Sequence, residues 1–138
     1  MELVKSGKEK IMQYNHLTNE QKAVLIDKAT EAPYSGKFLH NKENGTYKCA
    51  ACNSQLFSSD TKFDSGSGWP SFDHALPNSI KQVIDKSHGM RRTEVVCAKC
   101  GGHLGHIFND GPKETTGVRY CINSLSLDFD KKDKIRHD

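Results

Sequence analysis

The chain has 138 residues, of which 35% are hydrophobic and 27% are charged, and its formal net charge is +3. This length suffices for one domain with its own core, and the composition is typical of a globular protein rather than of a disordered or membrane-embedded one. The lysines and arginines are scattered, which argues against a nucleic-acid binder, because such proteins concentrate basic residues on one surface.

The N-terminal stretch MELVKSGKEKIMQYN does not look like a signal peptide, because it has no apolar core and no small-residue cleavage site. No apolar run approaches the roughly 18 to 20 residues that cross a bilayer. The five cysteines are an odd number, and without an export signal a disulfide framework is not expected. We therefore predict a cytoplasmic chain without membrane contact and, by default, a monomer.

The first structural elements expected are helical. Residues 1–16 are charged and weakly periodic, which predicts an N-terminal helical arm. The next stretch, Thr18-Asn19-Glu20-Gln21, has the capping-box pattern of a hydroxyl residue with Gln three positions later. This pattern predicts a helix that carries the apolar residues 23–26 and ends before Pro33.

Beyond Pro33 the sequence favours short antiparallel strands. Turn-forming residues recur every few positions, and the apolar runs between them have strand length. The runs are GTYKCAAC, QLFS, IKQVID, RTEVVC, HLGHIF, GVRYCIN and SLSLDF. In the last run Leu125, Leu127 and Phe129 alternate with polar residues, which is the period of a half-buried strand. We predict a mainly β fold in a single domain, 1–138, with a solvated tail at 130–138.

Four of the cysteines form two CxxC turns, Cys49 with Cys52 and Cys97 with Cys100. A two-residue gap lets both thiolates of a turn reach one centre about 2.3 Å away, so that two turns complete a tetrahedral metal site. The alternative is four buried or redox-active thiols, but a thioredoxin-like pair requires a βαβ setting that the sequence lacks. We predict one structural zinc ion per chain, because four thiolates leave no open position for water.

The fifth cysteine, Cys121, stands alone in the sequence. A free cysteine is often a small buried hydrophobe. However, Arg119 and Asn123 are each two residues away, so that on a strand the three side chains share a face. On that face a guanidinium favours the thiolate, and an amide offers both a donor and an acceptor. Cys121 is therefore a candidate nucleophile.

Two histidines and the only tryptophan are further candidates. Lone histidines are usually surface or core residues, but His103 and His106 lie in one apolar hexapeptide and are candidates for a shared acid–base site. Trp69 lies in GSGWPSF, where it serves either as the wall of a pocket or as part of the core. Residue chemistry alone does not identify a substrate for these groups.

The motifs GWPSF, HLGHIF, FNDGP and RYCINS, with two CxxC turns in the right order, resemble the methionine-R-sulfoxide reductase B family. The resemblance extends from about Thr18 to Phe129. It implies two antiparallel β-sheets with short N-terminal helices, a structural zinc remote from the active site, and an active-site cysteine at Cys121. The implied reaction is the reduction of the R epimer of methionine sulfoxide, mainly in proteins, to methionine.

The resemblance also implies a role for each candidate residue. Cys121 attacks the sulfoxide sulfur and is left as a sulfenic acid, while His103 and His106 orient and protonate the substrate oxygen. Asn123 and Arg119 hold this network and stabilise the thiolate.

The implied substrate contacts are Trp69, which packs on the ε-methyl group of the substrate, and Phe108. The implied partners are oxidised proteins as substrates and thioredoxin or a small thiol as the reductant. The implied biological role is the repair of oxidative damage.

The sequence departs from the family at one position. Many members carry a resolving cysteine just before GWPSF, and here that position is Ser67. Three explanations remain: thioredoxin or a small thiol reduces Cys121 directly, a zinc thiolate substitutes for the resolving cysteine, or the serine is an engineered replacement. We favour the first, because a zinc thiolate that reacted would dismantle the metal site.

The alternative function is a zinc-ribbon module that binds nucleic acid or protein without catalysis. It accounts for the CxxC pairs but leaves Cys121, the two histidines and the GWPSF loop without a role. It also predicts aromatic residues interleaved with Lys and Arg on one surface, and the sequence contains no such run. Thiol chemistry on another electrophile, such as a peroxide, accounts for Cys121 but not for the whole set of motifs.

Overall fold

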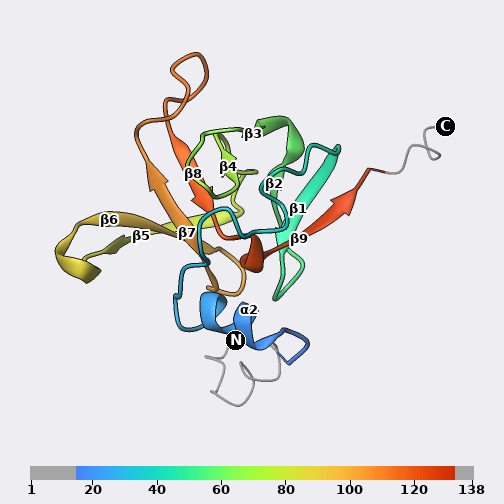
Figure 1. Cartoon of the computed structure of the whole chain (residues 1–138), viewed down its shortest axis with the longest axis vertical. Helices are drawn as coiled ribbons and strands as arrows, with labels where there is room; N and C mark the ends of the chain where they lie inside the picture. Colours follow the sequence, from blue (N-terminus) through green and yellow to red (C-terminus); the bar gives the residue numbers. More distant parts are fainter. Residues whose placement is uncertain (1–14, 133–138) are drawn as a thin grey trace.

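The computed structural model describes residues 15–132, in which one α-helix precedes two antiparallel β-sheets (Figure 1). The three-stranded sheet has the order β2-β1-β9, and the six-stranded sheet has the order β3-β4-β8-β7-β6-β5. The mainly β fold with two antiparallel sheets, as predicted, is confirmed.

The strands of the smaller sheet are β1 (Gly45–Cys49), β2 (Gln55–Ser58) and β9 (Leu127–Lys131). Those of the larger sheet are β3 (Lys62–Phe63), β4 (Ser71–Phe72), β5 (Ile80–Asp85), β6 (Arg92–Cys97), β7 (His103–Phe108) and β8 (Arg119–Ile122). Short 3₁₀ helices occupy Ser59–Thr61, Ser87–Gly89 and Ser124–Ser126.

The helix α2 (Asn19–Leu25) begins at the predicted capping box. The Gln21 backbone N–H donates to the Thr18 hydroxyl at 3.1 Å, and the Gln21 side chain accepts from the Thr18 backbone at 2.9 Å. The helix ends well before Pro33, as expected. Within residues 15–132 we find no helix with the length and apolar character that a membrane span requires. The arm predicted for 1–16 lies almost wholly outside the described residues.

All seven predicted runs contain a strand, but the last one differs in detail. Residues 124–126 form a 3₁₀ turn, and the strand begins only at Leu127. The turn forms because the backbone of Leu125 donates to the buried carboxyl of Glu31, and that of Ser126 to the Asn123 carbonyl. The strand then runs to Lys131, so that the predicted tail begins inside β9. The two-residue strands β3 and β4 were missed because they are too short to show a period.

The core lies between the two sheets and is rich in aromatic side chains. Tyr47 of β1, Phe57 of β2 and Phe72 of β4 are fully buried. The rings of Phe57 and Phe72 stack with their centroids 4.4 Å apart, and Tyr47 meets Phe72 edge to face at 5.2 Å. These contacts cross from one sheet to the other and fix their relative position.

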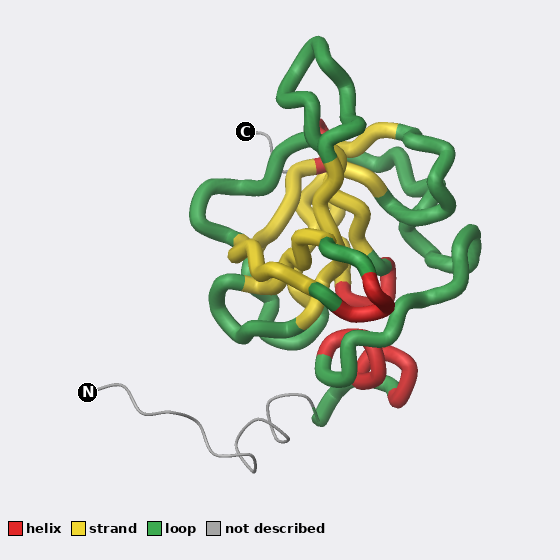
Figure 2. The backbone as a smooth tube through the Cα atoms, turned by 90° about the vertical axis from the view of Figure 1, so that its left-hand side faces the viewer, coloured by secondary structure: helices red, strands yellow, loops and turns green. Residues whose placement is uncertain are grey.

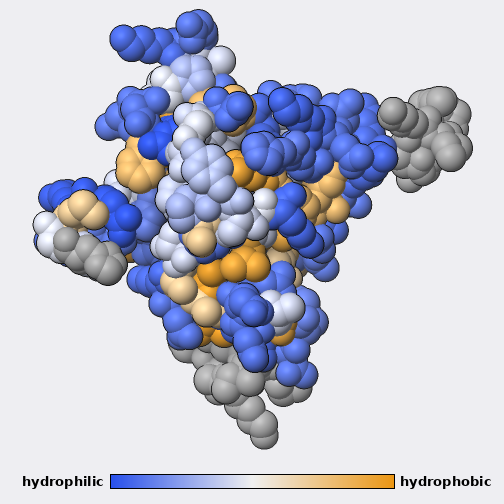
Figure 3. Space-filling model, viewed as in Figure 1, coloured by the Kyte–Doolittle hydropathy of each residue, from blue (hydrophilic) through white to orange (hydrophobic). Residues whose placement is uncertain are grey.

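Strands occupy the centre of the molecule and loops surround them (Figure 2). The connection between β7 and β8, the longest between two strands, projects from one end (Figure 1). Hydrophilic residues cover most of the face shown in Figure 3, and hydrophobic ones appear where α2 meets the strands. Val24 and Leu25 of α2 are buried.

Candidate active site and metal centre

The pairing of β8 with its two neighbours determines what surrounds Cys121. Cys121 lies directly opposite Ser71 of β4 on one side and His106 of β7 on the other. His106 in turn is opposite Glu94 of β6. Residues paired directly across antiparallel strands point to the same face, so that these four side chains form one row across the larger sheet.

The close approach of β7 and β8 depends on Gly105. A Cβ atom at this position would lie 1.9 Å from the backbone oxygen of Cys121. Any other residue would therefore displace the strand that carries Cys121. The glycine inside HLGHIF is thus required for the geometry of the site.

A small pocket of about 90 Å³ opens over this row of side chains. The lining residues important for the chemistry are Trp69, Arg92, His106, Phe108, Cys121 and Asn123. Five of these residues were expected from the sequence, and only Arg92 was not. Two other predicted residues, His103 and Arg119, are not among the residues that line the pocket.

Burial and charge act in opposite directions on the thiol. Burial raises the pKa of Cys121, and the Arg119 guanidinium and the Ser67 hydroxyl oppose this effect without outweighing it. The expectation that Arg119 favours the thiolate is correct in direction. However, the sulfur is predominantly a thiol at neutral pH, because desolvation is the larger effect.

Arg119 is held in place by a carboxylate that the sequence analysis did not identify. Its Nε and Nη2 atoms donate to the two carboxylate oxygens of Asp110 at 2.9 and 3.2 Å. Its guanidinium also lies over the Phe108 ring, 4.6 Å from the centroid. The hydrogen bond from Arg119 lowers the pKa of Asp110, which stays ionised. Asp110 lies in the FNDGP motif, so its place in the sequence was a usable signal.

A second carboxylate holds His106. Nε2 of His106 lies 2.8 Å from Oδ2 of Asp85, at the end of β5, and Arg92 donates to the same oxygen at 3.3 Å. The hydrogen bond with His106 lowers the pKa of Asp85. Asp85 was missed because it precedes the turn between two strands, where an acidic residue is usually solvated.

A third carboxylate holds His103. Nδ1 of His103 lies 2.8 Å from Glu94, and both side chains are buried. Lys28 pairs with the second oxygen of Glu94 at 3.3 Å. Burial lowers the pKa of His103 although Glu94 opposes the change, so that the ring is neutral near pH 7. Its Nε2 atom has no partner, and its ring centroid is 5.5 Å from that of His106.

Asn123 uses both ends of its amide on the backbone. Its oxygen accepts from the Glu31 N–H at 3.0 Å, and its nitrogen donates to the Leu104 carbonyl at 3.0 Å. The Glu31 carbonyl accepts from the indole nitrogen of Trp69, also at 3.0 Å. Asn123 therefore connects β7 to the segment that positions the tryptophan. Glu31 was not identified from the sequence.

Ser67 lies beside Cys121 and belongs to a short chain of hydroxyl groups. Ser65 donates to Ser67 at 2.8 Å and also lies 2.7 Å from the Ser71 hydroxyl. The Ser67 hydroxyl reaches the sulfur of Cys121 and contributes to lowering its pKa. The position expected for a resolving residue is therefore close enough to Cys121 to influence the pKa of its thiol.

The four remaining cysteines come together as the CxxC turns predicted. Their sulfur atoms all lie within 4.8 Å of one another. The Cys49–Cys100 and Cys52–Cys97 sulfur pairs are 3.7 and 3.6 Å apart. A tetrahedron with metal–sulfur bonds of about 2.3 Å has edges of about 3.8 Å, so this cluster could hold a metal ion.

The two turns have matching backbones. The residue after the second cysteine has a positive φ in both, +66° at Asn53 and +79° at Gly101. Both conformations are compatible with these residue types. One turn follows β1 of the smaller sheet and the other follows β6 of the larger sheet, so that the cluster joins the sheets. Cys97 and Arg92 are at opposite ends of β6, which separates the cluster from the pocket.

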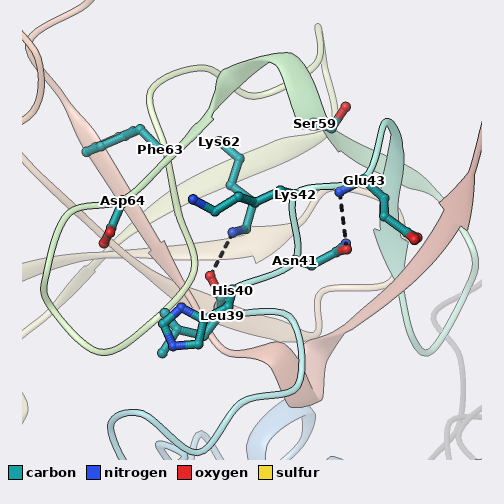
Figure 4. A pocket seen from close by; sticks show the side chains of 9 residues that line it. All are labelled: Leu39, His40, Asn41, Lys42, Glu43, Ser59, Lys62, Phe63 and Asp64. Atoms are coloured by element: carbon teal, nitrogen blue, oxygen red, sulfur yellow. Dashed lines mark hydrogen bonds between the residues drawn. The ribbon is translucent and has the colours of Figure 1, made fainter.

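Another pocket, shown in Figure 4, contains none of the predicted site residues. It lies between residues 39–43 and 59–64. Lys62 donates to the Leu39 carbonyl at 2.8 Å, and burial lowers the pKa of this lysine. The carbonyl therefore already binds the ammonium group, and we assign no chemistry to this pocket.

Comparisons with known proteins agree with this geometry. Residues 17–131 match the model of the SelR domain family. The chain is 58% identical over 117 residues to the peptide methionine sulfoxide reductase MsrB of Leptospira interrogans, covering 84% of this chain and 88% of the relative. It is 52% identical over 119 residues to the probable methionine-R-sulfoxide reductase B of Caenorhabditis elegans, covering 85% and 78%.

Among solved structures, the crystal structure of the Mis18 "Yippee-like" domain aligns with a TM-score of 0.53 at 16% sequence identity. The alignment covers 67% of this chain and all of that one. At this identity the likeness concerns the fold alone.

The balance of effects on Cys121 can be tested by replacing Arg119. Because the guanidinium lowers the pKa of the thiol, we expect Arg119→Met to move the pH midpoint of Cys121 alkylation by iodoacetamide to a higher value. The rate is measured by mass spectrometry of the peptide that contains Cys121. The exposed Arg91→Met carries the same charge change and should leave the midpoint unchanged. A midpoint that moves to lower pH in Arg119→Met would contradict our interpretation.

Proposed function

This chain belongs to the SelR family, and from this premise we propose that the pocket around Cys121 is the active site of a methionine sulfoxide reductase. The protein reduces methionine-R-sulfoxide in oxidised proteins to methionine, with a thiol as the reductant. The observation that carries the site assignment is that Cys121 and His106 are directly paired on one sheet face, beneath a pocket bordered by Trp69.

The sulfur of Cys121 forms the new bond in the proposed reaction. Its thiolate attacks the sulfoxide sulfur, and the sulfoxide oxygen takes up a proton as its bond to that sulfur weakens. The hydroxyl group then moves to the Cys121 sulfur as the transient bond between the two sulfur atoms breaks, which leaves a sulfenic acid on Cys121 and releases methionine. The cysteine is oxidised by two electrons and the sulfoxide is reduced by two, so that the step balances.

His106 is the proposed proton donor, because it lines the pocket beside Cys121. The Nε2 atom of His106 is hydrogen-bonded to Asp85, so that Nδ1 is the ring nitrogen available to the substrate oxygen. His103 acts as a positioning residue, because it is buried, packs against the His106 ring and is fixed by Glu94.

The walls of the pocket fit a methionine side chain. Trp69 offers an apolar surface for the ε-methyl group, and Phe108 is a second aromatic residue of the lining. Arg119 supplies the positive charge that assists thiolate formation on substrate binding. Asn123 holds the Trp69 wall through the Glu31 backbone.

The assignment is tested by incubating the protein with racemic methionine sulfoxide and dithiothreitol and following both epimers by chiral chromatography. Only the R epimer should disappear. Cys121→Ser should lower the rate by at least about 10³-fold, because the nucleophile is lost. Its metal content should match that of the wild type, which excludes misfolding. Substantial activity in Cys121→Ser, or consumption of the S epimer, would contradict the proposal.

The four-cysteine cluster is proposed to bind one structural zinc ion. The proposal is supported by the four cysteine sulfur atoms and the distances between them, since four thiolates at these distances suit tetrahedral Zn²⁺. With all four positions occupied the ion would bind no substrate. Its role would be to join the two sheets.

Removal of the metal should therefore destabilise the fold. We expect chelation to lower the free energy of unfolding by about 4 kcal/mol or more, the value for a ligand at a thousand times its Kd. Denaturant unfolding before and after chelation, with elemental analysis, measures this difference. Cys52→Ser should lose the metal, whereas Cys121→Ser should retain one ion per chain. An apo protein as stable as the metal-bound one would refute the role.

For recycling, we propose that thioredoxin or a small thiol reduces the Cys121 sulfenic acid directly. The support is Ser67, whose hydroxyl group occupies the place of a resolving thiol and cannot form a disulfide. The other four cysteines are committed to the metal cluster.

Ser67→Cys should restore an internal resolving step. After one turnover without reductant, the introduced thiol should attack the sulfenic acid, form a disulfide with Cys121 and release water. Intact-mass and peptide mapping would detect this disulfide, whereas the wild type should give a dimedone adduct at Cys121. A dimedone adduct that persists in Ser67→Cys would show that the two positions do not meet in solution.

The competing zinc-ribbon module is not favoured, because the relatives that match most of the chain are reductases.

We propose that the enzyme acts as a monomer, since one chain supplies every residue of the site. The cytoplasmic location stays a prediction from the sequence.

A further inference from the structure

Strand β5 is the outer strand of the larger sheet and carries two adjacent, exposed apolar residues. Val83 is 44% exposed and Ile84 is 48% exposed. The β5–β6 hairpin extends away from the body of the molecule (Figure 1). Exposed apolar side chains on an edge strand are unusual, because they invite contact with another chain.

The strand register places these two residues on opposite faces. Val83 of β5 is paired with Glu94 of β6. Glu94 is paired with His106 of β7, which is paired with Cys121 of β8. Val83 therefore lies on the same sheet face as the pocket, outside the residues that line it. Ile84 is paired with Thr93 and belongs to the other face, with Ile107 and Tyr120. The apolar surface at Val83 thus faces the same side as the pocket.

The hairpin is continuous with the pocket. Arg92, at the start of β6, lines the pocket and is bound to Asp85 at the end of β5. Strands in a sheet are about 4.8 Å apart, so that Val83 lies roughly 14 Å from Cys121, three strands away. An extended polypeptide spans this distance in about four residues.

We propose that the pocket-side face of the β5–β6 hairpin, centred on Val83, is the docking surface for the extended polypeptide that flanks the methionine sulfoxide. The inference rests on the proposed function, which places the sulfoxide at Cys121. Its occupant is the same substrate chain, because a side chain bound in the pocket brings its neighbours over this face. The surface selects an apolar residue about four positions from the sulfoxide.

The test compares three substrates by kcat/KM with dithiothreitol. Two are nonapeptides with methionine-R-sulfoxide in the centre and polar residues around it, one with Leu at both ends and one with Ser at both ends. The third is the N-acetyl, N-methylamide derivative of methionine-R-sulfoxide, which is too short to reach the hairpin. The wild type should prefer the Leu peptide by about three- to tenfold, as expected for a partly buried apolar contact.

Two matched variants locate the contact. Val83→Thr and Ile84→Thr both keep a β-branched side chain, so strand propensity is preserved. Val83→Thr should abolish the preference for the Leu peptide and leave the short substrate unaffected. Ile84→Thr should behave like the wild type with all three substrates.

Three results would overturn the inference: a preference that survives in Val83→Thr, one lost equally in Ile84→Thr, or a wild type without preference. Sedimentation of the wild type and Val83→Thr gives a further test. Self-association that depends on Val83 would show a second copy to be the occupant. Failure of the wild type on the short substrate would instead overturn the proposed function itself.

Discussion

The pairing of β8 between β4 and β7 is the interaction on which the rest of the site depends. It places Cys121 opposite His106 and Ser71, and it is possible only because Gly105 lets the two backbones approach. A shift by one residue would turn Cys121 into the core and expose Ile122 instead, since side chains alternate between faces. The chemistry therefore depends on the register at least as much as on the residue types.

Carboxylates hold three of the charged or titratable side chains in and around the pocket. Asp85 binds His106, Glu94 binds His103, and Asp110 binds Arg119. Each pair fixes a ring or a guanidinium that would otherwise choose among several rotamers. The pKa values of Asp85 and Asp110 are lowered by the hydrogen bonds to their partners, whereas burial raises the pKa of Cys121. The pocket thus combines a thiol whose pKa is raised by burial with two carboxylates whose pKa values are lowered by their partners.

The four-cysteine cluster and the proposed active site are located in different parts of the fold. The aromatic core and the four-cysteine cluster join the two sheets, and the cluster is at the end of β6 away from Arg92. The pocket lies on the outer face of the larger sheet and uses loops for its walls. A rigid β framework can in this way hold a small open site, which gives a polypeptide access to the buried sulfur.

Local sequence determined the elements with strong short-range signals. The capping box at Thr18, the longer apolar runs and the two CxxC turns act over a few residues, so that their structures could be predicted. The motifs identified the family and the residues around Cys121. Tertiary structure alone decided the partners Asp85, Glu94, Asp110 and Glu31, because each contact joins segments whose proximity depends on strand order and register. It also decided the net protonation of Cys121, since desolvation is a property of the packed site and not of neighbouring residues in the chain.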